Sequence, residues 1–95
     1  MHQAFILTTV TVRDATAFAA YRTAIAGLNE RIGGEMLVRG SAIETLEGAP
    51  GEPEHVVAIG FPSAEAARAY IASHEYQAAR PLREAAGSFR IRLIA

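Results

Sequence analysis

The amino-acid sequence predicts a single α+β domain, with strands and helices in the order β-α-β-β-α-β. Runs of β-branched and aromatic residues, typical of strands, occur at four places along the chain. Two segments between them repeat apolar residues at helical spacing. The chain has 95 residues, of which 51% are hydrophobic and 20% charged, so it can bury one core and has no room for a second.

The first strand and the first helix are predicted from the N-terminal third of the chain. Residues 3–12 form a β-branched and aromatic run, and Asp14 after it is suited to cap a helix. Apolar side chains then recur in steps of three and four residues, at Phe18, Tyr21, Ile25, Leu28 and Ile32. We therefore expect a helix over about residues 15–32, ended by Gly33 and Gly34.

The second strand is predicted in two pieces, residues 35–39 and 42–47, with a bulge or bend at Gly40 and Ser41. A loop rich in glycine and proline follows over residues 48–53.

The third strand is predicted over residues 55–61, and its apolar composition is typical of a central strand. Ser63 can cap a second helix, which is expected to end near Ser73.

A further helical piece is expected over residues 74–86, broken by Pro81 and stopped by Gly87. In the last strand, apolar and basic residues alternate: Phe89, Arg90, Ile91, Arg92 and Leu93.

This order of elements predicts a ferredoxin-like fold. Right-handed crossover connections place both helical segments on one face of an antiparallel four-stranded sheet. The helices cover only that face. The core face is predicted to carry Phe5, Leu7, Val57, Ile59, Phe61, Phe89, Ile91 and Leu93.

The opposite face of the sheet is predicted to carry Ile6, Val10, Val12, Val56, Ala58 and Ile94, beside Arg90 and Arg92. This set is too apolar for a face left in water. We therefore expect a homodimer joined through the face that carries Ile6, Val10 and Val56. The alternative is a monomer with an ordinary mixed surface.

Composition excludes several classes of function. Nine basic residues and ten acidic ones give the chain no excess of positive charge with which to bind nucleic acid or an anionic membrane. All nine basic residues are arginine, which excludes Schiff-base chemistry on a lysine. The chain has no cysteine, as suits a reducing compartment, and no apolar run near the roughly 20 residues that span a bilayer. The expectation is a soluble cytoplasmic protein.

Several sequence strings resemble one known family over nearly the whole chain. They are Tyr21, Gly33-Gly34, Leu37-Val38-Arg39-Gly40, Leu46-Glu47-Gly48, Phe61-Pro62-Ser63-Ala64-Glu65-Ala66-Ala67, and Ser73-His74-Glu75-Tyr76-Gln77 with Arg80. The chain resembles the family called domain of unknown function 1330. That resemblance implies the dimeric α+β barrel form of the ferredoxin-like fold, but no reaction and no catalytic residues.

Related barrel families include cofactor-free monooxygenases and haem-degrading enzymes built around an Asn, Trp and His constellation. The chain has no Trp and a single Asn, Asn29, which disfavours haem chemistry. No cofactor is expected.

Two residues are candidate catalytic groups. His74 can act as a general acid or base near neutral pH, and Tyr76 can donate a hydrogen bond to a developing oxyanion. The alternative is that His74 serves the helix end, where polar side chains satisfy exposed backbone groups.

Four residues are candidate substrate-binding groups. Tyr21 and Tyr70 come from different helices and can line a cleft against the sheet, although core packing explains them equally well. Arg39 can bind an anionic group of a ligand, or it can form an ion pair with an acidic residue of the protein. His55 can lie at the mouth of a pocket, or it can face solvent. The histidines have no paired-ligand spacing, so no metal site is expected.

Two functions from different classes remain open. The protein is either a small cofactor-independent enzyme or binder of an apolar or aromatic molecule in a helix-sheet cleft, or a dimeric structural or interaction module without catalysis.

Overall fold

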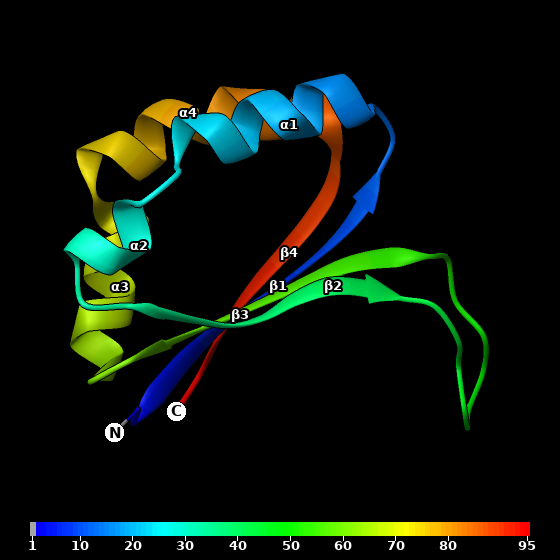
Figure 1. Ribbon diagram of the computed structural model, residues 1–95, viewed down its shortest axis with the longest axis horizontal. Coiled ribbons are helices and arrows are strands. Elements are labelled where there is room, and N and C mark those ends of the chain that lie inside the picture. The colour runs from blue at the N-terminus through cyan, green and yellow to red at the C-terminus, as the bar shows by residue number, and fades with distance from the viewer. Residues whose placement is uncertain (1) are drawn as a thin grey trace.

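The computed structural model describes residues 2–95 and shows one sheet covered by helices on one face (Figure 1). The elements are β1 Ala4–Val12, α1 Ala15–Ala24, α2 Leu28–Arg31, β2 Glu35–Ala42, β3 Glu54–Phe61, α3 Ala64–Ala72, α4 His74–Ala86 and β4 Gly87–Ile94.

The sheet has the strand order β2-β3-β1-β4, and every neighbouring pair is antiparallel. Helices α1 and α4 run beside each other over one end of the sheet, while α2 and α3 lie over the other end (Figure 1). The predicted ferredoxin-like α+β class is confirmed.

Three helix starts are capped by side chains. Oδ1 of Asp14 accepts a hydrogen bond from the backbone N–H of Ala17 at 3.0 Å. Oγ of Ser63 accepts from the N–H of Ala66 at 3.1 Å, and Oγ of Ser73 accepts from the N–H of Tyr76 at 3.2 Å. The caps predicted at Asp14 and Ser63 are confirmed, because each short side chain satisfies an N–H that has no partner inside its helix.

The predicted helix over residues 15–32 is in fact two helices. α1 ends at Ala24 and α2 begins at Leu28, after Gly27 with a φ of +77°. Glycine adopts this left-handed conformation without the steric penalty of a Cβ atom. The apolar spacing continues across the break, which is why periodicity alone did not reveal it.

The break predicted at Pro81 is wrong, because α4 continues through it to Ala86. Pro81 removes one helical hydrogen bond. Buried residues on both sides of the proline, Tyr76 and Ala79 before it and Ala86 after it, hold both halves of the helix in the core.

The second strand also differs from its prediction. β2 runs without a break from Glu35 to Ala42, and its irregularity lies between Met36 and Val38, not at Gly40 and Ser41. Beyond Ala42 the chain leaves the sheet, and the β2–β3 connection over residues 43–53 projects from the body (Figure 1). Ile43 and Leu46 on this connection are 94% and 85% exposed.

The face assignment of β1 corrects the prediction. Ile6 lies opposite Ile59 of β3, and Val10 lies opposite Phe89 of β4, so both point toward the helices. Ile6 and Val10 are 3% and 1% exposed. Because both alternations of β1 are apolar, the sequence pattern does not fix its orientation, and the pairing with both neighbours does.

The face away from the helices, here called the open face, therefore carries Phe5 and Leu7 of β1. Its other members are Val56, Ala58, Arg90, Arg92 and Ile94, by their pairing with the odd-numbered residues of β1. The predicted placement of Val56, Ala58 and Ile94 is confirmed. The predicted placement of Val12 on this face is wrong, because Val12 shares the alternation of Ile6 and Val10. Several large side chains on this face are only half-buried.

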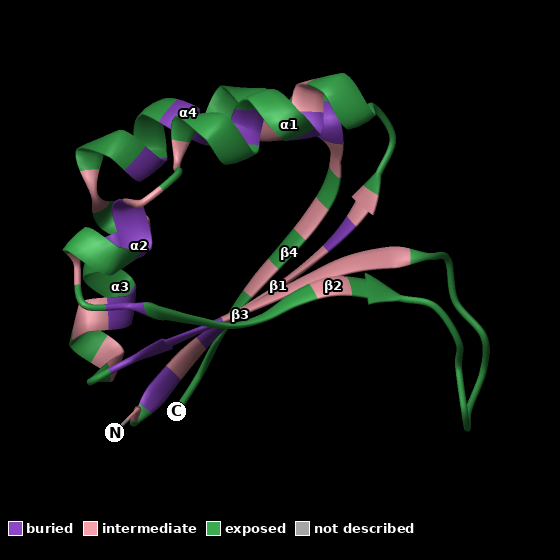
Figure 2. Ribbon diagram, in the orientation of Figure 1, coloured by how far each residue is buried: buried purple, intermediate pink, exposed green. Residues whose placement is uncertain are grey.

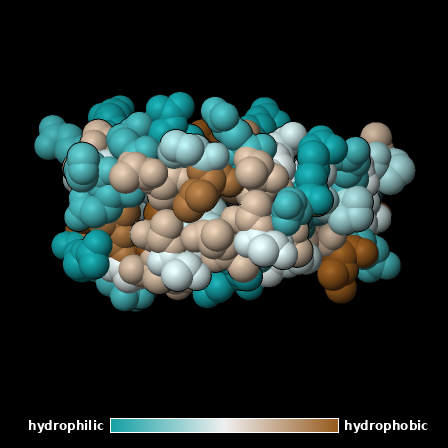
Figure 3. All heavy atoms as spheres, turned by 90° about the horizontal axis from the view of Figure 1, so that it is seen from above, coloured by the Kyte–Doolittle hydropathy of each residue, from teal (hydrophilic) through white to brown (hydrophobic). Residues whose placement is uncertain are grey.

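Buried positions, purple in Figure 2, occur on the helices and on the strands. The buried side chains form two clusters. The first, under α2 and α3, contains Ile6, Leu28, Ile59, Phe61 and Tyr70. The second, under α1 and α4, contains Val10, Phe18, Tyr21, Ala79 and Ala86. The outer side of α1 and α4, viewed from above, shows mostly teal polar atoms and pale residues (Figure 3).

We expect Asp14→Ala to lower the free energy of unfolding by about 0.5 to 2 kcal/mol, because the Ala17 N–H loses its acceptor. Asp14→Ser restores an N-cap acceptor and is the matched control. Urea denaturation of the three proteins measures the effect, and equal stability of the alanine and serine variants would contradict it.

Candidate functional site

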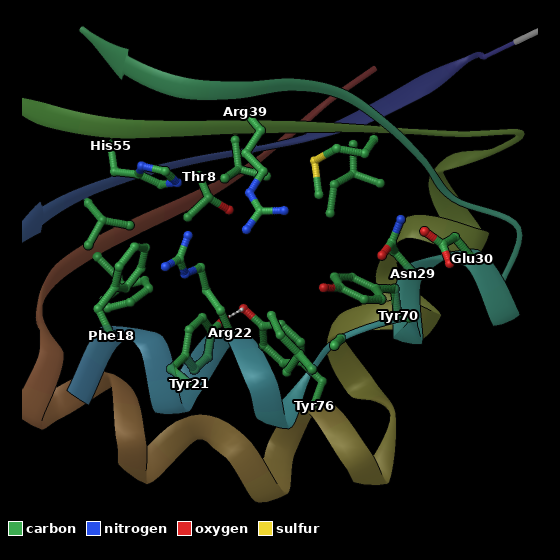
Figure 4. A pocket seen from close by; sticks show the side chains of 18 residues that line it. Thr8, Phe18, Tyr21, Arg22, Asn29, Glu30, Arg39, His55, Tyr70 and Tyr76 are labelled. Carbon is green, nitrogen blue, oxygen red and sulfur yellow. Dashed lines mark hydrogen bonds between the residues drawn. The ribbon is translucent and has the colours of Figure 1, made fainter. Parts of the chain in front are cut away.

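A pocket of about 270 Å³ lies between the helices and the sheet, where the two buried clusters meet (Figure 4). It borders Ile59 and Tyr70 of the first cluster and Val10 and Phe18 of the second. Ile25, Ala26 and Gly27 form part of its wall. The break between α1 and α2 thus contributes directly to the pocket.

Most of the wall is apolar or aromatic. Its apolar members are Val10, Phe18, Ile25, Ala26, Met36, Val57, Ile59 and Phe89. The rings of Tyr21 and Phe89 meet edge to face, with centroids 5.1 Å apart. Such a wall favours an apolar or aromatic ligand body, because its binding removes apolar surface from water on both partners.

Three tyrosines from the helical layer, Tyr21, Tyr70 and Tyr76, line the pocket (Figure 4). The Tyr21 hydroxyl donates to the Tyr76 hydroxyl at 3.1 Å, and Nη1 of Arg83 donates to the same oxygen at 3.3 Å. Since the Tyr76 oxygen accepts from two donors, its own hydrogen remains for a further acceptor. The Tyr70 hydroxyl points toward the centre of the pocket (Figure 4).

Burial raises the pKa of both Tyr21 and Tyr70 well above the ordinary value, and the nearby Tyr76 raises it further. These hydroxyls therefore stay protonated near neutral pH. Neither can serve as a tyrosinate base. The Tyr70 hydroxyl can donate a hydrogen bond to a ligand oxygen, whereas the Tyr21 hydrogen is already donated to Tyr76.

His55 of β3 lies at the other side of the pocket, edge-on to Phe18 at 5.1 Å between ring centroids. Its Nε2 atom is buried and has no hydrogen-bond partner within residues 2–95. Burial lowers the pKa of His55 below 6.5, and the charges of Arg22 and Arg39 lower it further. His55 is therefore neutral near pH 7 and can accept or donate one proton.

Two arginines reach the pocket from opposite layers. Arg22 comes from α1, with its guanidinium carbon 5.0 Å from the centre of the Phe18 ring. Arg39 comes from β2, on the sheet side (Figure 4). Both line the pocket at its exposed rim.

A second polar group lies at the opposite end of the pocket, on α2 (Figure 4). Asn29 is 7% exposed, and its Nδ2 is buried without a hydrogen-bond partner in the described chain. Glu30 beside it is exposed and also lines the pocket. A buried amide without a partner is costly in a folded protein, and a ligand acceptor would satisfy it.

Comparison with known families assigns the chain. The family described as domain of unknown function (DUF1330) matches residues 3–95. The protein belongs to the DUF1330 family. No curated protein matches the chain.

Solved structures agree with this assignment. The chain is similar to the RPA0582 protein of unknown function from Rhodopseudomonas palustris, with 26% identity and a TM-score of 0.79 over 96% of this chain and 79% of that one. The methylated form of RPA0582 matches with 25% identity and a TM-score of 0.78, over 96% and 78% of the two chains.

A structure of an antibiotic biosynthesis monooxygenase shares the fold. Its identity is 14% and its TM-score 0.57, over 98% of this chain and 97% of that one. At this identity the likeness extends to the fold and no further.

Within this DUF1330 domain, the pocket brings together five of the six residues singled out from the sequence. Tyr21, Arg39, His55, Tyr70 and Tyr76 all line it.

His74 lies outside the pocket lining, as the exposed first residue of α4. Side chains two positions apart in an α-helix differ in direction by about 200°, so His74 and the buried Tyr76 point to opposite sides of α4. Their pairing as one catalytic unit has no support in this geometry.

Among the polar residues of the pocket, sequence reasoning missed four: Thr8, Arg22, Asn29 and Glu30. Arg22 follows Tyr21 directly, and no sequence pattern around it distinguishes it from an arginine exposed to solvent. Asn29 had one signal, a polar residue beside Leu28 within the apolar stripe of the predicted helix.

The described residues contain no group of three or more His, Asp or Glu side chains arranged to hold a metal ion. No helix in the described part of the chain is long and apolar enough to cross a membrane.

The lowered pKa of His55 predicts a pH dependence of stability. The unfolded chain binds a proton at His55 near pH 6.5, and the folded chain binds it only at lower pH. The free energy of unfolding therefore decreases as pH falls below 6.5. The decrease due to His55 stops once the pH is below the pKa of His55 in the folded chain. We expect His55→Gln to lose less stability than the wild type from neutral pH to about pH 5. Parallel stability profiles from urea denaturation would contradict this cause.

Proposed function

We propose that the protein binds a small apolar or aromatic molecule in the pocket between helices and sheet. The observation that carries the proposal is a cavity of about 270 Å³ with buried nitrogen atoms of His55 and Asn29 at its lining, neither of which has a partner in the described chain. Folded proteins rarely leave such atoms unsatisfied without a ligand or water to pair with them.

The size of the cavity supports a ligand of one ring. A cavity of about 150 Å³ suffices for benzene, so the larger volume of this pocket accepts a ring with a few substituent atoms. The three tyrosine hydroxyls and the apolar wall offer a ligand both hydrogen bonds and burial.

The same residues can transfer a proton without a cofactor. Neutral His55 can accept a proton from a bound molecule, and the hydroxyls of Tyr70 and Tyr76, whose hydrogens are not donated within the described chain, can stabilise negative charge on an oxygen. Proton abstraction next to a carbonyl group is the reaction class that this set of groups supports. We place this chemistry in the cytoplasm, as the absence of cysteine favours.

Ala26 lies exposed at the wall of the pocket, so Ala26→Trp would place a large ring against the pocket without replacing a buried residue. We expect this variant to bind neutral aromatic probes such as 4-methylphenol and indole at least about tenfold more weakly than the wild type. The measurement is chemical-shift titration, which also shows whether signals of pocket residues move.

The matched control is Ala20→Trp, which adds the same ring on the exposed side of α1, outside the pocket. It should bind the probes like the wild type. If the probes cause no shifts at pocket residues in the wild type, or bind equally to both variants, the proposed function is wrong.

We also propose that the protein is a homodimer joined through the open face. The apolar side chains of Phe5, Leu7 and Val56 support this, because no helix of the described chain covers them. The projecting β2–β3 connection supports it too, since Ile43 and Leu46 are almost fully exposed on it and a partner chain would bury them. A brown apolar group is visible at that end of the molecule (Figure 3).

Val56→Asp should reduce the mass measured by light scattering from that of a dimer to that of a monomer, because a carboxylate in a dry interface is costly. Leu82→Asp introduces the same charge at an exposed position of α4 and should remain dimeric. A monomer mass for the wild type at high micromolar concentration would refute the dimer.

A further inference from the structure

The rim of the pocket carries two guanidinium groups, those of Arg22 and Arg39, which have no carboxylate partner among residues 2–95. Within residues 2–95, the ion pairs join His2 to Glu35 and Arg31 to Glu75. Neither Arg22 nor Arg39 lies within ion-pair distance of an acidic group. Both side chains extend toward the space between α1 and the sheet, from opposite layers (Figure 4).

Two further observations place these groups together in the pocket. Arg22 stacks over Phe18, which in turn meets His55 edge-on, so the guanidinium is held beside the pocket wall. Burial lowers the pKa of His55, and the positive charges of Arg22 and Arg39 lower it further, so both arginines act electrostatically on His55. One end of the pocket is therefore positive, although the whole chain has a net charge of −1.

The opposite end has different chemistry. Glu30 and the unpaired amide of Asn29 lie there, and the Tyr70 hydroxyl points from that side toward the centre (Figure 4). A second negative charge on a ligand would meet Glu30. A neutral oxygen would instead accept hydrogen bonds from Asn29 and Tyr70.

We propose that the pocket binds a small aromatic or cyclic monocarboxylate, with its carboxylate between Arg22 and Arg39 and its ring against the apolar wall of Ile25, Val57 and Ile59. This inference rests on the proposed function, and it adds the charge and orientation of the ligand. A guanidinium matches the planar geometry of a carboxylate and donates two parallel hydrogen bonds to it.

A carboxylate fits better than a phosphate ester for two reasons. The ester carries close to two negative charges near neutral pH, in a pocket that also holds Glu30. A ring and a carboxylate also use most of the volume of about 270 Å³, which leaves little space for a larger anionic group.

The test compares acids with their neutral amides on the full-length protein. Benzoate, phenylacetate and 4-hydroxybenzoate are titrated beside benzamide, phenylacetamide and 4-hydroxybenzamide, which have nearly the same shape but no charge. We expect each acid to bind the wild type about tenfold or more tightly than its amide, and the difference to shrink at high salt.

Arg22→Gln and Arg39→Gln should each weaken binding of the acids by about tenfold and weaken binding of the amides much less, because the amides lose only a neutral hydrogen bond. The matched control is Arg68→Gln, which removes the same charge from an exposed site on α3 outside the pocket lining. It should bind the acids like the wild type. Arg39→Lys should recover part of the lost affinity, because it restores charge without the planar fork.

A third readout is the NMR titration of His55. A bound carboxylate offsets the charges of Arg22 and Arg39, so the acids should raise the pKa of His55 and the amides should not.

The outcomes separate the two proposals. If acids and amides bind equally, and the glutamine variants behave like the wild type, the carboxylate inference is wrong and the pocket remains a site for neutral ligands. Tighter binding of phenyl phosphate than of benzoate would overturn the assignment of a carboxylate. If neither acids nor amides shift signals of pocket residues, the proposed function fails, and the carboxylate inference fails with it.

Discussion

The constraint on which the structure depends is the pairing of β1 with strands on both sides. Hydrogen bonding to β3 and β4 fixes which alternate residues of β1 face the helices. Ile6 and Val10 then close the core, and Thr8 between them reaches the pocket. A slip of one residue would bring Phe5 and Leu7 under the helices and remove Thr8 from the pocket floor. The register of β1 with β3 and β4 therefore determines which of its residues lie in the core, at the pocket and on the open face.

The second determinant is the helix break at Gly27. A continuous helix from residue 15 to residue 32 would run straight, whereas the sheet beneath it twists. The left-handed turn lets α1 pack over Val10 and Phe89 while α2 packs over Ile59 and Phe61. The two buried clusters remain separate at the turn. The space left between them is the pocket, so the site is a product of how two short helices cover one curved surface.

The polar groups of the pocket show how burial sets their chemistry. Tyr21 and Tyr70 are held protonated because their surroundings disfavour a phenolate. His55 is held neutral because burial and two arginines disfavour an imidazolium. A carboxylate ligand would offset the lowering of the His55 pKa by the arginines, since it brings a negative charge to Arg22 and Arg39. Binding of a carboxylate would therefore be coupled to protonation of His55.

The sequence by itself determined the order of elements, the caps at Asp14 and Ser63, and five residues of the pocket, because each depends on local spacing and residue type. Tertiary structure alone decided the orientation of β1, whose two apolar alternations are equivalent as patterns. It decided that Tyr76 enters the pocket while His74 does not. It also decided that Arg22, an ordinary surface arginine in sequence, faces Arg39, since only the stacking of a helix on a sheet brings residues from α1 and β2 to one rim.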